Sequence, residues 1–185
     1  IEAMAKGAEE IAEFTDPLGR VLESRELPNG IQISRVSVPM GAIFFIYESR
    51  PNVTADAFAL AYKSGNAILL RGSSSALNSN KAIVSAIVEG LSSVECGVPE
   101  GIALAQSGSH EEVNDILSAK GKIDVVLPRG GAKLIKMVVE NAKIPVIETG
   151  SGVCHIFVDE SADLERAAII AENAKLQRPG VCNAM

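Results

Sequence analysis

The sequence has 185 residues and a formal net charge of -6, which comes from 17 basic and 23 acidic side chains. A chain of this length can bury one ordinary hydrophobic core or slightly more. An apolar share of 47% and a charged share of 22% argue against wholesale disorder and against a coiled coil. Because the basic residues are scattered along an acidic chain, no nucleic-acid partner is expected.

The first 38 residues are predicted to form a helix followed by a hairpin. Residues 1–14 are rich in Ala and Glu and begin like the middle of a helix, as though the chain were cut from something larger. After a break at Asp16-Pro17, residues 20–38 alternate in polarity around a turn that ends in Asn29-Gly30. This part therefore stands outside the pattern that follows.

From Gly41 onward, short apolar runs alternate with longer amphipathic stretches, which predicts repeated strand-helix units and an α/β fold with a parallel sheet. The predicted strands cover residues 41–47, 67–71, 102–106, 123–127 and 145–147. The predicted helices cover residues 53–64, 75–93, 110–119 and 131–142, and a further helical stripe begins at Leu164. Gly65 is expected to end a helix in a left-handed conformation, and Ser109 to cap the start of one.

Apolar runs and cysteines set limits on location and on metal binding. The runs GAIFFIY and NAILL are too short to cross a bilayer, so no membrane partner is expected. The three cysteines form no CxxC pair and have no zinc-like spacing, so we predict neither a disulfide framework nor a metal site. We expect Cys96 and Cys154 to lie in the core, and the protein to be cytoplasmic.

Ligands of open parallel sheets bind beyond the carboxyl ends of the strands, so the loops there are the candidate site. The stretches RGSSSA and PRGG each place small residues and an Arg at a predicted helix start, where backbone N–H groups favour a phosphate. The sequence holds no GxGxxG and no GxxxxGK[ST], and these stretches also suit ordinary turns and caps. Both interpretations stay open at this level.

Three other residues could carry chemistry. Asn52 could cap a helix or donate to an oxyanion, and Glu148 could be a general base or a solvated carboxylate. Cys182 lies in the loop RPGVCNA, where Arg178 could stabilise a nucleophilic thiolate. Spacing alone leaves each of these alternatives open.

Five motifs in order change this balance: VPMGAIFFIYESRPNVTADA, YKSGNAILLRG, IDVVLPRGG, IPVIETGSGVCHIFVD and NAKLQRPGVCNAM. Over nearly the whole chain they resemble the gamma-glutamyl phosphate reductase family, a branch of the aldehyde dehydrogenase superfamily. The resemblance implies an open parallel-sheet, Rossmann-like nucleotide-binding domain of aldehyde dehydrogenase type over residues 39–178. It also implies NADPH-dependent reduction of gamma-glutamyl phosphate to glutamate-5-semialdehyde, the second step of proline synthesis.

The resemblance implies a role for several residues. Cys182 would form a thioester with the glutamyl group, and Asn52 with the backbone N–H of Cys182 would stabilise the oxyanion. Glu148 matches the superfamily glutamate that activates water, but a reductase must keep water from its thioester, so we expect Glu148 to position the nicotinamide or a proton instead. From its place four residues before Cys182, and not from the resemblance, we infer that Arg178 binds the acyl phosphate and lowers the pKa of the thiol. The residues expected to contact NADPH are Arg71, Ser73, Ser74, Pro128, Arg129, Gly130 and Gly150.

The resemblance further implies a second domain, of which residues 179–185 would be the start, so this piece would be inactive alone. We expect the full-length protein to form a homo-oligomer, partly through the hairpin. The other expected partner is the glutamate kinase that supplies the substrate. Two other functions are weighed against this one. They are a sister aldehyde dehydrogenase that oxidises a free aldehyde, and a nucleotide-binding fragment without catalysis.

Overall fold

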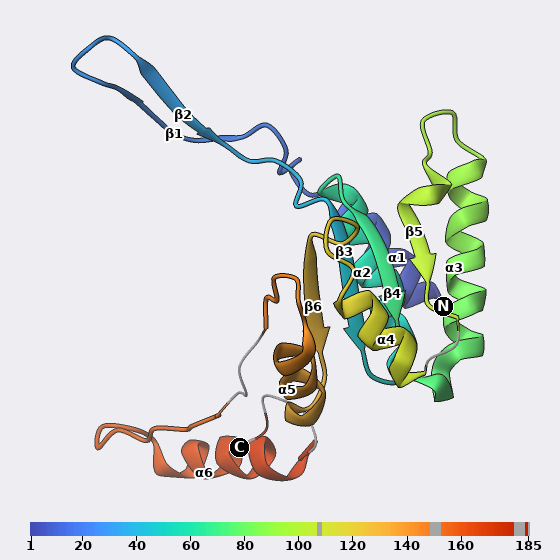
Figure 1. Cartoon of the computed structure of the whole chain (residues 1–185). Helices are drawn as coiled ribbons and strands as arrows, with labels where there is room; N and C mark the ends of the chain where they lie inside the picture. The colour runs from blue at the N-terminus through green and yellow to red at the C-terminus, as the bar shows by residue number, and fades with distance from the viewer. Residues whose placement is uncertain (107–108, 149–152, 180–183, 185) are drawn as a thin grey trace. The chain divides into compact units, whose positions relative to one another are not determined.

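The structure is a computed structural model that describes residues 1–106, 109–148, 153–179 and 184 (Figure 1). The chain divides into two compact units, Ile1–Glu148 and Thr149–Met185. The described residues contain no helix that is both long and apolar enough to span a membrane.

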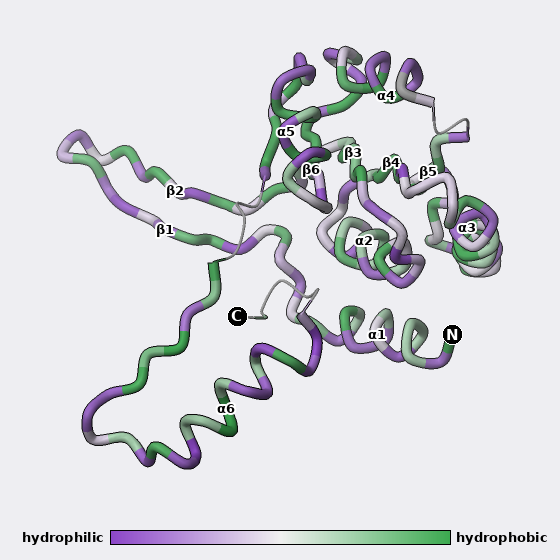
Figure 2. The backbone as a smooth tube through the Cα atoms, turned by 90° about the horizontal axis from the view of Figure 1, so that it is seen from below, coloured by the Kyte–Doolittle hydropathy of each residue, from purple (hydrophilic) through white to green (hydrophobic). Residues whose placement is uncertain are grey.

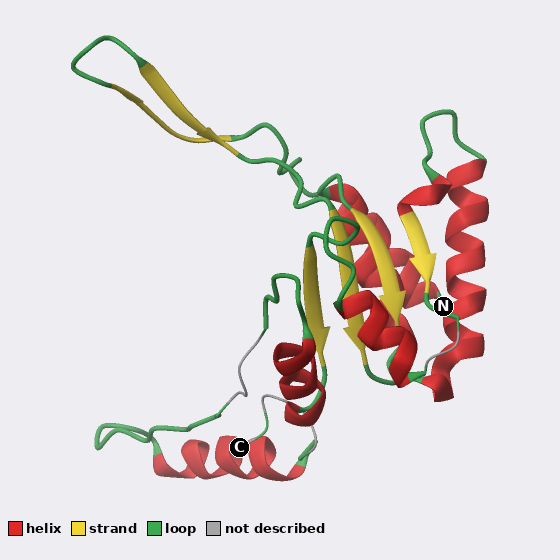
Figure 3. Cartoon of the chain, in the orientation of Figure 1, coloured by secondary structure: helices red, strands yellow, loops and turns green. Residues whose placement is uncertain are grey.

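The first unit is built on a four-stranded parallel sheet with the order β5-β4-β3-β6 (Figure 3). Its strands are β3 (Ala42–Tyr47), β4 (Ala67–Arg71), β5 (Ile102–Leu104) and β6 (Val125–Arg129). Ile43 pairs with Ile68 of β4 on one side and with Val125 of β6 on the other. The predicted α/β fold with a parallel sheet is confirmed.

Helices cover both faces of this sheet. Successive side chains of a strand point to opposite faces, so each strand contributes apolar side chains to two cores. Ile43 and Tyr47 pack in a core with Ala57 and Ala61, on the face covered by α2 (Pro51–Lys63) and α3 (Leu77–Ser92). The short helix η1 (Ser74–Ala76) precedes α3.

On the opposite face, Phe44 and Ile46 pack with Leu117 and Val138 of α4 (His110–Leu117) and α5 (Ala132–Asn141). Figure 2 shows the strands between these two pairs of helices. The strands are apolar on both faces because each face is covered.

The amino ends of the strands are joined by side chains. Asn66 accepts a hydrogen bond from the backbone N–H of Gly41 at 2.9 Å, and Asp124 accepts one from that of Ala42 at 2.7 Å. Gly65 has a φ of 72°, which confirms the left-handed helix end expected from the sequence. This arrangement binds β3, β4 and β6 together at the edge opposite the candidate site.

The amino-terminal elements are α1 (Glu2–Ala12), which packs on α2, and a hairpin of β1 (Val21–Glu26) and β2 (Gln32–Val36). The backbone N–H of Gly30 donates to the carbonyl of Leu27 at 2.8 Å, so the hairpin turn forms where it was predicted. All residues of both strands are exposed.

In the second unit, the described helix is α6 (Leu164–Leu176). Asp163 caps it by accepting hydrogen bonds from the backbone N–H groups of Glu165 and Arg166, at 3.0 and 3.1 Å. The apolar run 153–158 forms no strand, and Phe157 within it is 86% exposed.

Two predictions about the first unit are wrong. Residues 145–147 form no strand but a single parallel bridge from Val146 to Val126, and Pro145 brings no N–H to extend the pairing. Cys96 is exposed rather than buried, because it follows the end of α3 in a surface turn. Cys154, in the second unit, is partly buried.

Candidate functional site

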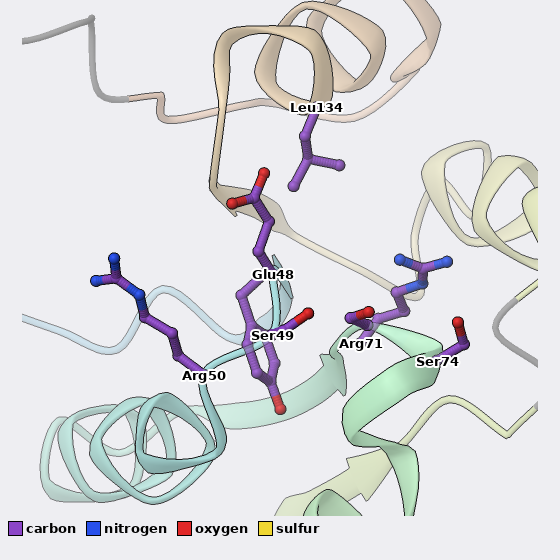
Figure 4. A pocket seen from close by; sticks show the side chains of 8 residues that line it. Glu48, Ser49, Arg50, Arg71, Ser74 and Leu134 are labelled. Carbon is purple, nitrogen blue, oxygen red and sulfur yellow. The ribbon is translucent and has the colours of Figure 1, made fainter. Parts of the chain in front are cut away.

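An open cavity of about 450 Å³ lies at the carboxyl ends of β3 and β4 (Figure 4). Its walls come from the loop after β3, from the loop after β4 and from α5. The residues that line it are Tyr47, Glu48, Ser49, Arg50, Arg71, Ser73, Ser74 and Leu134. The cavity is therefore where an open parallel sheet binds its ligands.

The loop after β4 is shaped by its own serines. Ser73 caps η1, since its hydroxyl accepts the backbone N–H of Ser75 at 3.3 Å, and the two hydroxyls lie 2.9 Å apart. The Ser75 hydroxyl also lies 3.1 Å from that of Ser49, which follows β3. These contacts hold the loops after the two central strands against each other.

The loops after β3 and β6 meet through Glu48. Its carboxylate accepts a hydrogen bond from the backbone N–H of Gly131 at 2.7 Å, where α5 begins. A Cβ added at Gly130 would lie 2.8 Å from three atoms of the Glu48 side chain, so a larger residue there would have to displace that side chain. A negative charge also suits this helix end, because the helix dipole is positive there.

Below the cavity lies a buried chain of hydroxyl and amide groups. The Tyr47 hydroxyl lies 2.5 Å from that of Thr54, which donates to the side-chain carbonyl of Asn80 at 3.0 Å. Burial raises the pKa of Tyr47 above its ordinary value of 10.0, and the hydrogen bond with Thr54 opposes this rise. The phenol is therefore neutral near neutral pH.

The side of the cavity formed by the end of β4 and the loop after it suits an anion, whereas Glu48 places a carboxylate in the lining from the loop after β3. Arg71 brings a permanent positive charge, and Ser73 and Ser74 bring hydroxyl donors at the start of a helix. These residues fit the phosphate groups of a dinucleotide cofactor. Among the residues that the structure describes, no cluster of three or more His, Cys, Asp and Glu side chains could hold a metal ion.

The structure brings together some of the predicted site residues. Arg71, Ser73 and Ser74 line the same cavity. Gly130 lies in the turn before α5, whereas Pro128 and Arg129 end β6 and do not belong to that turn. Pro128 can stand in β6 because the N–H that proline lacks would point away from β3. Val126, two residues earlier and therefore facing the same side, makes its backbone hydrogen bonds with residues 145 and 147 and not with β3.

Other predicted residues lie outside the cavity lining. Asn52 is the second residue of α2 and is exposed, and its amide donates to Asp56 at 3.4 Å. Arg50 occupies the capping position that Asn52 was considered for. Glu148 is exposed at the end of the first unit, and Arg178 is exposed in the second. Gly150 and Cys182 lie outside the described residues.

Sequence reasoning missed Glu48 and the buried chain. Glu48 lies in the motif VPMGAIFFIYESRPNVTADA directly after a predicted strand, and this position was the signal that could have identified it. No comparable signal marked Asn80, because one Asn in an amphipathic helix is most often on the solvent side.

Comparisons with known proteins show the family to which the chain belongs. A profile of the aldehyde dehydrogenase family matches residues 1–184. The gamma-glutamyl phosphate reductase of Caldanaerobacter subterraneus subsp. tengcongensis is 55% identical over 100% of this chain and 44% of its own length. The chain thus spans less than half the length of this relative.

Solved structures resemble the chain as well. The crystal structure of gamma-glutamyl phosphate reductase from Thermotoga maritima matches with a TM-score of 0.89 and 50% identity, covering 99% of this chain and 44% of that one. An engineered glycolyl-CoA reductase with bound NADP+ matches with a TM-score of 0.67 and 21% identity, over 94% of this chain and 43% of that one. The second likeness concerns the fold alone.

Proposed function

We propose, because the chain belongs to the aldehyde dehydrogenase family, that it forms the NADP-binding part of a gamma-glutamyl phosphate reductase. The observation that carries the proposal is the cavity at the carboxyl edge of the sheet, where Arg71, Ser73 and Ser74 converge. The 55% identity over the whole chain supports the choice of this reductase. The reaction belongs to the protein that contains this chain, in proline synthesis.

The cavity residues suit NADPH for reasons of charge. Arg71 and the hydroxyls of Ser73 and Ser74 would hold the 2'-phosphate and ribose of the adenosine, while Pro128, Arg129, Gly130 and Gly150 would lie nearer the pyrophosphate and nicotinamide. NADPH, when bound, supplies the hydride for the reduction. The Arg71 guanidinium would attract a 2'-phosphate, which is charged, more strongly than a 2'-hydroxyl, which is neutral.

The covalent chemistry is proposed for Cys182. Its thiolate attacks the γ-carbonyl carbon of gamma-glutamyl phosphate, forming a thioester as inorganic phosphate leaves. Asn52 would donate to the oxyanion of the tetrahedral intermediate, and Arg178 would bind the acyl phosphate. Glu148 would position the nicotinamide or a proton, because an acyl phosphate reductase must keep water from the thioester. Reduction releases glutamate-5-semialdehyde and returns the thiol.

The test runs the reaction in the oxidative direction with the protein that contains this chain. With glutamate-5-semialdehyde and NADP, we expect cofactor reduction that requires inorganic phosphate, because phosphate must cleave the thioester. A Cys182→Ser variant serves as the inactive control. Phosphate-independent oxidation would indicate an aldehyde dehydrogenase that uses water instead, and NADPH binding without turnover would indicate a nucleotide-binding protein without catalysis.

Several finer points remain predictions. They are the preference for NADPH over NADH, the division at residues 38 and 178, the homo-oligomer, the glutamate kinase partner and the cytoplasmic location. The isolated chain is expected to bind nucleotide without turnover, which a titration of its nucleotide affinity and a parallel activity assay would test.

A further inference from the structure

The loop that carries the cavity's anion donors rests on the buried chain of Tyr47, Thr54 and Asn80. These side chains are 2%, 0% and 0% exposed. They come from the end of β3 and from the first turns of α2 and α3, three separate elements. The hydrogen bonds of 2.5 and 3.0 Å link all three beneath the loop.

Gly72 is the point where the loop meets this chain. A Cβ added at Gly72 would lie 2.3 Å from the side-chain nitrogen of Asn80 and 3.1 Å from two ring carbons of Tyr47. The backbone between Arg71 and Ser73 therefore lies directly on both side chains. Any movement of Asn80 or Tyr47 is transmitted to the two neighbours that line the cavity.

The hydrogen bonds among Tyr47, Thr54 and Asn80 also have a defined donor-to-acceptor direction. The Thr54 hydroxyl has one proton, which it donates to Asn80, so the hydroxyl of Tyr47 must donate to Thr54. The Asn80 side-chain nitrogen is buried and makes no hydrogen bond to any residue in the described part of the chain. Apolar side chains would fill this space without burying such a group, so stability alone does not explain the choice of residues.

We infer that Thr54 and Asn80 are positioning residues, which hold Gly72 so that Arg71 and Ser73 are preorganised for the 2'-phosphate of NADPH. This inference rests on the proposed cofactor function. It assigns discrimination between NADPH and NADH in part to a hydroxyl that is buried and has no access to the nucleotide. Arg71 and Ser73 contact the phosphate directly, and the buried side chains fix the positions of these two residues.

The experiment compares Thr54→Val, which removes the hydroxyl at nearly constant volume, with Thr54→Ser, which keeps it. Affinities for NADPH and NADH are measured by fluorescence titration, and amide hydrogen exchange at Gly72 and Ser73 is measured without nucleotide. We expect Thr54→Val to weaken NADPH binding about tenfold, to change NADH binding less than about threefold, and to speed exchange in the loop. Thr54→Ser should restore all three values.

Two results would overturn the inference. One is an equal loss of affinity for both nucleotides in Thr54→Val, as expected of a merely structural residue, and the other is unchanged loop exchange. If the unaltered protein binds no NADPH while loop exchange still responds to Thr54→Val, the cofactor proposal fails and the positioning of the loop stands. Should Thr54→Val fail to fold, Tyr47→Phe removes the other hydroxyl, and a smaller shift in the same direction is required.

Discussion

Gly130 offers a test in which the sign of a stability change depends on a second residue. In Gly130→Ala, the new Cβ would lie 2.8 Å from three side-chain atoms of Glu48, which must then move. That side chain is flexible, but its carboxylate accepts the N–H of Gly131 at 2.7 Å. The movement therefore weakens a charge-assisted hydrogen bond at the start of α5.

Two opposing effects decide the magnitude. Losing a hydrogen bond to an exposed carboxylate at a helix start costs about 1 kcal/mol. Replacing Gly by Ala restricts the unfolded chain and contributes about 0.4–1 kcal/mol in the other direction. Gly130→Ala should thus lower the free energy of unfolding by up to about 0.6 kcal/mol in the unaltered chain. In a Glu48→Ala background the obstacle is gone, and the same change should raise it by about 0.5 kcal/mol.

The assay is urea unfolding of the four proteins of this double-mutant cycle, followed by circular dichroism. Gly90→Ala is the matched control, because a Cβ at Gly90 meets nothing within 4 Å on an exposed turn of α3. It should raise the free energy of unfolding by about 0.5–1 kcal/mol in both backgrounds. The contact between Glu48 and the glycine turn is refuted if Gly130→Ala has the same sign and size with and without Glu48.

Two further predictions concern a buried phenol and a helix cap. Because burial raises the pKa of Tyr47, its stabilising contribution is fully present below about pH 10 and is lost as pH rises through the folded-state pKa. Urea midpoints should fall above about pH 10, and Tyr47→Phe should flatten that fall; parallel curves would contradict the assignment. Asp163→Ala should weaken the start of α6 by about 1 kcal/mol and speed amide exchange at Glu165 about fivefold. Asp163→Asn should leave exchange nearly unchanged, and equal rates in both variants would exclude the capping role.

The parallel sheet could be predicted because local pattern and tertiary structure agree there. Apolar runs such as the one over β3 are buried on both faces, and Gly65 takes the left-handed conformation that its position after α2 required. The hairpin followed from its turn residues in the same way. The strand predicted at residues 145–147 was wrong because three apolar residues in a row do not decide whether strand pairing continues beyond one bridge.

The site was predictable in its location but not in its contacts. Arg71 and Ser73 could be placed at a strand end from the sequence alone, whereas the bond of Glu48 to Gly131 joins residues 83 positions apart. Asn80 was missed because helical periodicity describes one face of a helix and does not report which polar residue turns inward. Cys96 was misplaced because cysteine is usually buried, a tendency of the residue type that a surface turn overrides.

The bonds that Asn66 and Asp124 make at the amino ends of the strands have a consequence for engineering. They secure the assembly of β3, β4 and β6 at the edge opposite the candidate site. A library that varies Ser73 and Ser74 after β4 to change ligand preference, while keeping Gly72 because a Cβ there would meet Asn80, would leave these two hydrogen bonds unchanged and should keep a high fraction of folded members. Varying Asp124 instead would disturb the scaffold before any new specificity could be selected.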